Sequence, residues 1–170
     1  MKKKILMLTV TLLAISIFAF PVIHATQPTV TSIEYFRNVE NTISVDWRFS
    51  GKSQFMVIVK ESVRTGSIYE GTDVSGTKLF EFTQWGSCEQ NYKLGKAQWH
   101  FYVDWIKDSD SGFRGKLNGD TFGSTMMELE SYTVSGVLQG YGEFKGEKLI
   151  VEMARTPPNA AQITGVKITN

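Results

Sequence analysis

Two glutamates separated by one residue, Glu128 and Glu130, have the spacing that best fits a catalytic reaction. On a β-strand, alternate residues share one face and lie roughly 7 Å apart along the backbone. Glycoside hydrolysis uses two carboxyl groups about 5–10 Å apart, so this pair indicates a carbohydrate-active enzyme with a β-sandwich fold. Two glutamates on a solvated face are also commonplace, and Thr125 and Glu128 fit a capping box that would start a short helix. In a helix the two carboxylates would diverge.

Aromatic side chains gather on single faces of two predicted strands. Strict alternation over residues 97–106 puts Trp99, Phe101 and Trp105 on one face, and the same rhythm over 43–49 puts Trp47 on the apolar face of its strand. In a barrel these faces would point inward, where large side chains either fill the core or line a cavity for an apolar ligand. The candidate ligand-binding residues are therefore Trp47, Trp99, Phe101 and Trp105, with core packing as the alternative.

Groups for nucleophilic or metal chemistry are scarce. Once an expected signal segment is removed, one histidine (His100) and one cysteine (Cys88) are left. A Ser or Cys nucleophile needs a nearby base, which is usually His, and zinc needs several Cys or His ligands. One cysteine cannot form an internal disulfide, so we expect Cys88 to be buried or to lie in an inert loop. The sequence therefore predicts no catalytic residue outside the glutamate pair, no metal ion and no cofactor.

The first 25 residues have the features of a secretory signal peptide. Three lysines at positions 2–4 precede an apolar run over residues 5–20, and Ala25 ends a suitable cleavage site. Cleavage would leave 145 residues, enough for one domain with its own core, and would change the formal charge from +1 to −2. That charge gives no attraction for nucleic acid. The alternative is an uncleaved membrane anchor over residues 5–23, because the apolar run approaches the length that spans a bilayer.

The elements that would position these groups are short strands. Besides the alternating segments, β-like runs rich in Val, Ile, Thr, Phe and Tyr lie at 29–36, 54–63, 77–85, 132–144, 148–153 and 162–169. The 15 glycines lie mostly between these runs, and no proline occurs from Thr29 to Thr156, as hydrogen-bonded ladders require. Many strands hide their edges best by closing into a cylinder. We predict an all-β fold over residues 26–170, a single antiparallel β-barrel of about 8–10 strands, with a two-sheet sandwich as the alternative.

A glycine-rich segment, residues 134–149 (VSGVLQGYGEFKGEKL), would form a hairpin between two long strands. It resembles the closing hairpin of small barrels of the allene oxide cyclase and dirigent type, in which Gly-x-Gly-x-aromatic-x-Gly joins two strands. Residues 112–115 (GFRG) are similar to an earlier turn of that pattern. The resemblance implies a barrel with an apolar cavity, and it carries over no catalytic or binding residue.

These observations favour a secreted, non-enzymatic β-barrel that binds an apolar small molecule or a surface partner. We expect no nucleic-acid partner, and membrane contact only through an uncleaved N-terminal segment. Two other classes stay open: the carbohydrate-active enzyme that would use Glu128 and Glu130, and a structural module of the cell surface held by residues 5–23. Ligand binding requires that the face of Trp99, Phe101 and Trp105 borders a cavity, whereas a purely structural role requires a filled interior.

Overall fold

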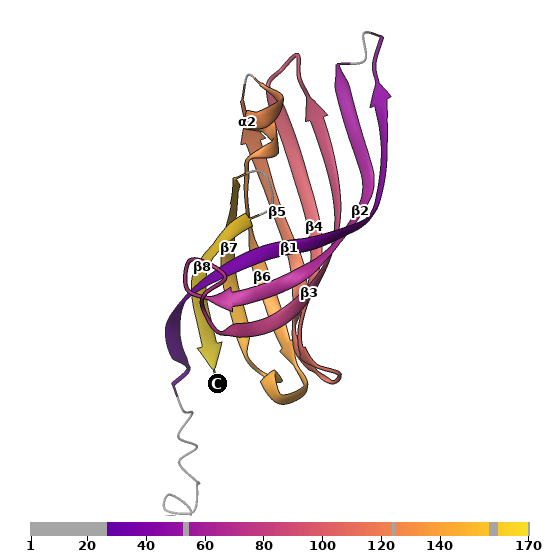
Figure 1. The fold of residues 1–170 in the computed structure, drawn as a ribbon. Helices are drawn as coiled ribbons and strands as arrows, with labels where there is room; N and C mark the ends of the chain where they lie inside the picture. Colours follow the sequence, from indigo (N-terminus) through magenta and orange to yellow (C-terminus); the bar gives the residue numbers. More distant parts are fainter. Residues whose placement is uncertain (1–26, 53–54, 124, 157–159, 170) are drawn as a thin grey trace, which may run out of the picture.

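Eight antiparallel strands form a closed barrel in the computed structural model, which describes residues 27–52, 55–123, 125–156 and 160–169. The strands follow one another around the barrel in chain order, and pairing of the first with the last closes it (Figure 1). They are β1 (Thr29–Ser50), β2 (Met56–Glu70), β3 (Lys78–Asn91), β4 (Lys96–Asp108), β5 (Ser111–Phe122), β6 (Tyr132–Tyr141), β7 (Lys148–Thr156) and β8 (Ala160–Thr169). The predicted all-β barrel is confirmed, and because the sheet closes on itself the two-sheet sandwich is not formed.

Two short helical segments accompany the barrel. The α-helix α2 (Met126–Glu130) connects β5 to β6, and the 3₁₀ turn η1 (Gly142–Phe144) connects β6 to β7. The predicted signal peptide and the alternative anchor over residues 5–23 lie outside the described residues. Within the described ranges, no helix has the length and apolar character needed to cross a membrane.

Alternation of buried with exposed or partly exposed residues gives β3, β4 and β6 one buried face. In β4, every second residue from Ala97 to Trp105 is buried, and the residues between them are exposed or partly exposed. The predicted strand over 97–106 is therefore confirmed, together with the inward direction of its aromatic face.

β1 is longer than predicted, since the runs at 29–36 and 43–49 belong to one strand of 22 residues. Its first part, Thr29–Asn38, pairs with β8 and closes the barrel, whereas residues 41–50 pair only with β2 among the described strands. The β1–β2 pairing shifts register at three points between Val39 and Trp47. Such bulges bend and twist a strand. The end of the β1–β2 hairpin consequently lies across the barrel from α2 (Figure 1).

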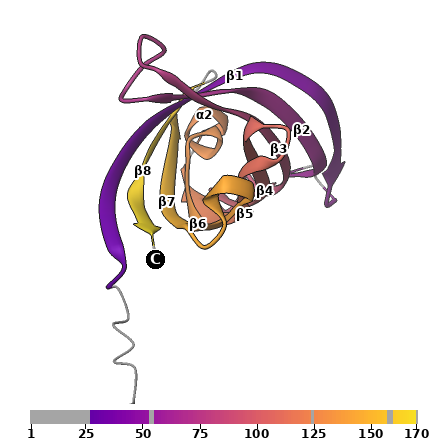
Figure 2. The same ribbon diagram turned by 90° about the horizontal axis from the view of Figure 1, so that it is seen from below.

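Aromatic side chains fill the opposite end of the barrel. The ring of Phe80 lies 5.9–6.2 Å from the rings of Trp105, Phe113 and Phe144, and Tyr35 packs on Trp105 at 6.3 Å. Phe144 is supplied by η1, the orange turn beside β6 in the view from below (Figure 2). Trp105 is only 1% exposed. This end of the barrel is therefore a packed core.

The glycine-rich segment forms the predicted hairpin, in which η1 joins β6 to β7 and Gly142 adopts a positive φ of 62°. The turn predicted at residues 112–115 is wrong, because these residues lie inside β5. A Cβ on Gly112 would lie 2.0 Å from the backbone carbonyl oxygen of Trp105. Glycine is thus needed at this position for the close approach of two strands.

Candidate ligand-binding site

A cavity of about 430 Å³ opens at the end of the barrel that carries the β1–β2 hairpin and α2. Strands β1 to β4 form one side of it, and α2 and β7 contribute to the other. Small-molecule sites typically measure about 300–1,000 Å³, so the cavity is large enough for a ligand. Most of its lining side chains are apolar or aromatic: Val45, Trp47, Phe49, Val57, Val59, Cys88, Tyr92, Trp99 and Phe101.

The register of the sheet explains why these residues meet. Trp47 on β1 pairs with Val59 on β2, Val59 pairs with Cys88 on β3, and Cys88 pairs with Trp99 on β4. Directly paired residues point to the same face of a sheet, so these four side chains form one row along the cavity wall. A second row runs through Val45, Ser62, Gly86 and Phe101.

The hairpin side of the cavity is only half covered. Trp47 and Phe49 are 51% and 50% exposed, and their rings pack edge to face at 5.1 Å. The reason is that residues 41–50 of β1 have a neighbouring strand on one side only in the described part of the chain. Apolar surface of this kind, beside a cavity, is typical of a ligand-binding groove.

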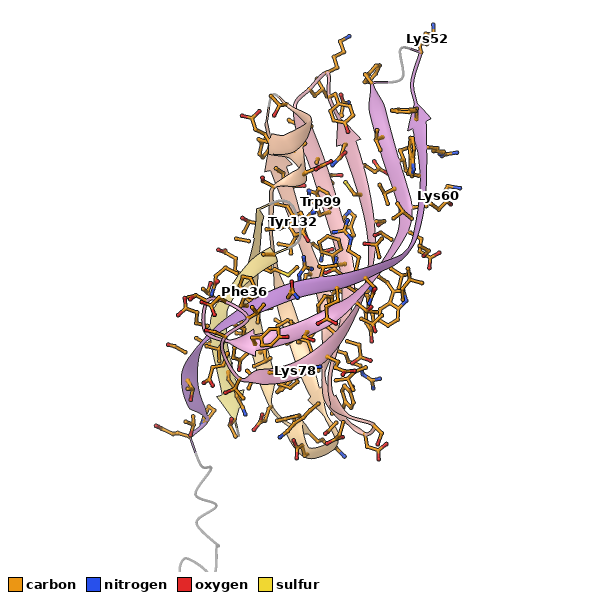
Figure 3. All side chains as sticks on the ribbon, viewed as in Figure 1. Phe36, Lys52, Lys60, Lys78, Trp99 and Tyr132 are labelled. Carbon is orange, nitrogen blue, oxygen red and sulfur yellow. The ribbon has the colours of Figure 1, made fainter. Side chains whose placement is uncertain are left out.

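Trp99 and Phe101 form the buried floor of the cavity. Tyr132 of β6 packs on both rings, with centroid distances of 4.7 and 5.2 Å, and Figure 3 shows Trp99 and Tyr132 close together inside the barrel. The indole N–H of Trp99 donates to Oγ1 of Thr121 at 3.2 Å, which satisfies its polar atom. A Cβ on Gly86 would lie 2.5 Å from the Phe101 ring, so this glycine leaves the space that the ring occupies.

Three of the four predicted ligand-binding residues, Trp47, Trp99 and Phe101, line the same cavity. The fourth, Trp105, shares a face of β4 with Trp99 but lies at the filled end, where Tyr35 and Phe80 pack against it. Trp105 is thus part of the packed core and does not line the cavity.

Three arginines lie inside this end of the barrel, and none of them was predicted from the sequence. Arg64 and Arg155 line the cavity. Arg37 is buried close to them, with an exposed fraction of 1%. Its guanidinium group donates hydrogen bonds to Oε1 of Gln84 and to the hydroxyl oxygen of Tyr132, the latter at 3.1 Å.

The three guanidinium groups are close enough to perturb one another. Burial lowers the pKa of Arg64, and the positive charge of Arg155 lowers it further. Burial also lowers the pKa of Arg155, and Arg37 adds to that effect, whereas Tyr132 and Glu130 oppose it. Glu130, which lines the cavity, is a carboxylate that acts on both Arg64 and Arg155. The guanidinium groups therefore repel one another in a partly desolvated setting.

A β-bulge explains why the sequence did not predict that Arg64 faces the cavity. The β2–β3 pairing shifts register between Val59 and Ser62, so the cavity-facing positions change from odd to even numbers along β2. A strict two-residue rhythm would have placed Arg64 on the outer face. The signal that could have revealed the bulge is Lys60–Glu61, two adjacent charged residues that interrupt an apolar run.

Cys88 faces the cavity and is 2% exposed, which confirms its predicted burial. Burial is the main cause that raises the pKa of its thiol to about 12. His100 points away from it, on the outer face of β4, and contacts Oδ1 of Asn118 at 2.9 Å. The two side chains therefore form no nucleophile–base pair, and the protonated thiol acts as a small apolar group.

The strand geometry expected for Glu128 and Glu130 is wrong, because both residues lie in α2. Thr125 and Glu128 form the capping box: the backbone N–H of Thr125 donates to Oε2 of Glu128 at 2.7 Å, and the N–H of Glu128 donates to Oγ1 of Thr125 at 3.2 Å. Residues two apart on a helix do not face the same way. Glu130 lines the cavity, whereas Glu128 is exposed, so the paired carboxylates of the glycosidase hypothesis do not share a face.

In the ranges that the structure describes, no three His, Cys, Asp or Glu side chains gather closely enough to hold a metal ion.

Neither a protein-family model, nor a curated protein, nor a solved structure matches this chain. The resemblance of the glycine-rich hairpin to allene oxide cyclase and dirigent barrels accordingly stays a prediction.

Proposed function

We propose that this protein is a non-enzymatic β-barrel that binds an apolar small molecule in the cavity beside the β1–β2 hairpin. The observation that carries the proposal is a volume of about 430 Å³ lined by aromatic and aliphatic side chains, in a barrel whose other end is packed. A ligand that covers the half-exposed rings of Trp47 and Phe49 gains about 25 cal/mol for each Å² of apolar surface removed from water.

The polar residues near the cavity also support binding rather than catalysis. The Cys88 thiol keeps its proton well above neutral pH, and His100 is on the outer surface of the barrel. Of the two glutamates considered as a catalytic pair, only Glu130 lines the cavity. Acid–base catalysis by two carboxylates would need both of them at the substrate.

Titration with Nile red, an uncharged apolar dye whose emission rises in apolar surroundings, tests the proposal. We expect saturable binding to the wild-type protein and its loss in Val59→Trp, which fills the cavity. Ile58→Trp is the matched control, because Ile58 is adjacent on β2 but does not line the cavity. Equal binding by both variants, or no binding to the wild type, would contradict the proposal, and absence of binding would favour contact of the exposed aromatic hairpin with a surface partner.

Export from the cytoplasm belongs to the same proposal, and the N-terminal sequence features support it. Cleavage after Ala25 would give an exported chain that begins at Thr26. N-terminal sequencing of the exported protein measures this directly. A chain that retains residues 5–23 would instead support the anchored surface module.

A further inference from the structure

We infer that the ligand is an amphiphile with an anionic head group, and that the head group is bound by Arg64 and Arg155 while its apolar tail lies along Trp47 and Phe49. This inference rests on the proposed function and adds the chemical class of the ligand. It depends on the presence of guanidinium groups and an exposed aromatic wall in the same cavity.

Mutual repulsion among the guanidinium groups favours the binding of an anion. Arg37, Arg64 and Arg155 interact with one another, and Glu130 is the one carboxylate among the charges that act on Arg64. A buried or partly buried charge is costly unless it is paired. An anionic group entering the cavity would therefore offset the repulsion that Arg155 and Arg37 exert on Arg64.

Hydrogen-bond donors without a partner among the described residues also lie beside these positive charges. In the described part of the chain, neither Nε of Arg64 nor Oγ of Ser62 has a hydrogen-bond partner, and both atoms are buried. Ser62 and Arg64 are alternate residues of β2, and both line the cavity. A planar guanidinium group matches carboxylate and phosphate oxygens with two parallel hydrogen bonds. The two residues thus offer a charge-assisted donor set to a single head group.

Arg37 acts as a positioning residue in this scheme. It does not line the cavity, but it is fixed by Gln84 and by the hydroxyl group of Tyr132. Gln84 is paired with Arg64 across the β2–β3 ladder. Arg37 therefore adds positive potential behind the head-group site without competing for its hydrogen bonds.

Polar and apolar parts of the cavity are arranged along one strand. Val57, which pairs with Phe49, lies at the apolar mouth, and Arg64 lies seven residues further along β2. At about 3.3 Å per residue, this separation is roughly 20 Å before the bulge shortens it. An extended alkyl chain with a charged end fits this order of surfaces.

Isothermal titration of the full-length processed protein with three ligands of equal chain length tests the inference. The ligands are dodecanoate, dodecan-1-ol and dodecyltrimethylammonium, at pH 8, below the micelle concentrations of the two ions and the solubility limit of the alcohol. We expect dodecanoate to bind at least tenfold more tightly than the alcohol and the cation to bind most weakly. Dodecyl phosphate forms a fourth arm: tighter binding than dodecanoate would identify phosphate as the preferred head group, and weaker binding would identify carboxylate.

Substitutions in the cavity and outside it sharpen the test. Arg64→Gln should weaken dodecanoate binding at least tenfold and leave dodecan-1-ol within twofold of wild type. Arg48→Gln removes the same charge from an exposed position of β1 that does not line the cavity, and should change neither affinity. Glu130→Gln should strengthen dodecanoate binding, because it removes a carboxylate that lines the cavity and acts on Arg64.

Two results would overturn the inference: equal affinity of the wild type for dodecanoate and dodecan-1-ol, or equal weakening of both ligands by Arg64→Gln. Either result, with Nile red binding intact, would leave the proposed apolar site standing. Failure of every ligand and of Nile red would reject both proposals together. The wild-type ligand series decides the question even if Arg64→Gln does not fold.

Discussion

Trp99 and Trp105 lie on the same face of the same strand, yet they belong to different regions of the molecule. Around Trp105, the rings of Tyr35 and Phe80 complete a packed core, whereas Trp99 forms the floor of a cavity. The difference comes from β1, which pairs with both β8 and β2 at the filled end but, among the strands that the structure describes, only with β2 over residues 41–50. A strand's own alternation decides which side chains point inward, and the strands around it decide whether the interior is filled.

Removal of a large aromatic side chain should have its largest effect at the filled end. We expect Trp105→Ala to lower the free energy of unfolding by about 3–5 kcal/mol, because it leaves a large void in a tight core. Trp47→Ala should cost less than about 1 kcal/mol, since this ring is half exposed. Urea denaturation measures both. A comparable loss in the two variants would mean that the hairpin belongs to the core and that the two regions are not distinct.

Replacement of a glycine by alanine should also destabilise the filled end of the barrel more than the cavity end. A Cβ on Gly112 would collide with the backbone carbonyl oxygen of Trp105 at 2.0 Å, whereas the close contact of one on Gly86 would be with the Phe101 ring at 2.5 Å. We expect Gly112→Ala to destabilise the protein by about 1–3 kcal/mol. Gly86→Ala should cost less, because the ring can turn into the cavity, and it should reduce Nile red binding. Thermal unfolding and dye titration of the two variants give the comparison, which an undisturbed dye affinity in Gly86→Ala would contradict.

The pH dependence of stability tests whether water reaches the Cys88 thiol, and its expected effect is smaller. Its pKa is raised from 9.0 to about 12 in the folded protein, so between these values the unfolded chain binds fewer protons than the folded one. Stability should therefore fall as pH rises above 9, by roughly 1.4 kcal/mol at pH 10 from this group alone. Cys88→Ala should remove that part of the slope. Melting temperatures of both proteins from pH 8 to 10 measure it, and parallel curves would show that water reaches the thiol.

Much of the fold could be predicted from the sequence, because the physical signal is local. The strand over 97–106, the capping box at Thr125 and the hairpin around Gly142 each follow from a few neighbouring residues. The strand β5 was missed because Gly112, Gly115 and Gly119 interrupt its apolar pattern. Those glycines are set by the approach of neighbouring strands, which is not a local property.

The candidate site was predictable only in part. Trp47, Trp99 and Phe101 could be identified because large aromatic residues at alternate positions are visible in the sequence. The arginines could not, since Arg64 turns inward through a bulge between Val59 and Ser62. Nor could alternation separate the wall residue Trp99 from the core residue Trp105, because that distinction depends on strands far away in the chain.

Over residues 41–50, one side of β1 has no partner among the described strands, which affects the behaviour of many copies in solution. A free row of backbone N–H and C=O groups can recruit the strand of a second molecule and start aggregation. Two breaks in register within this stretch, and a third between Val39 and Asn41, prevent a long flat run of hydrogen bonds. Asp46 and Arg48 also place charges along it. The irregularities that leave room for a ligand should thus also protect concentrated solutions of the protein from edge-to-edge association.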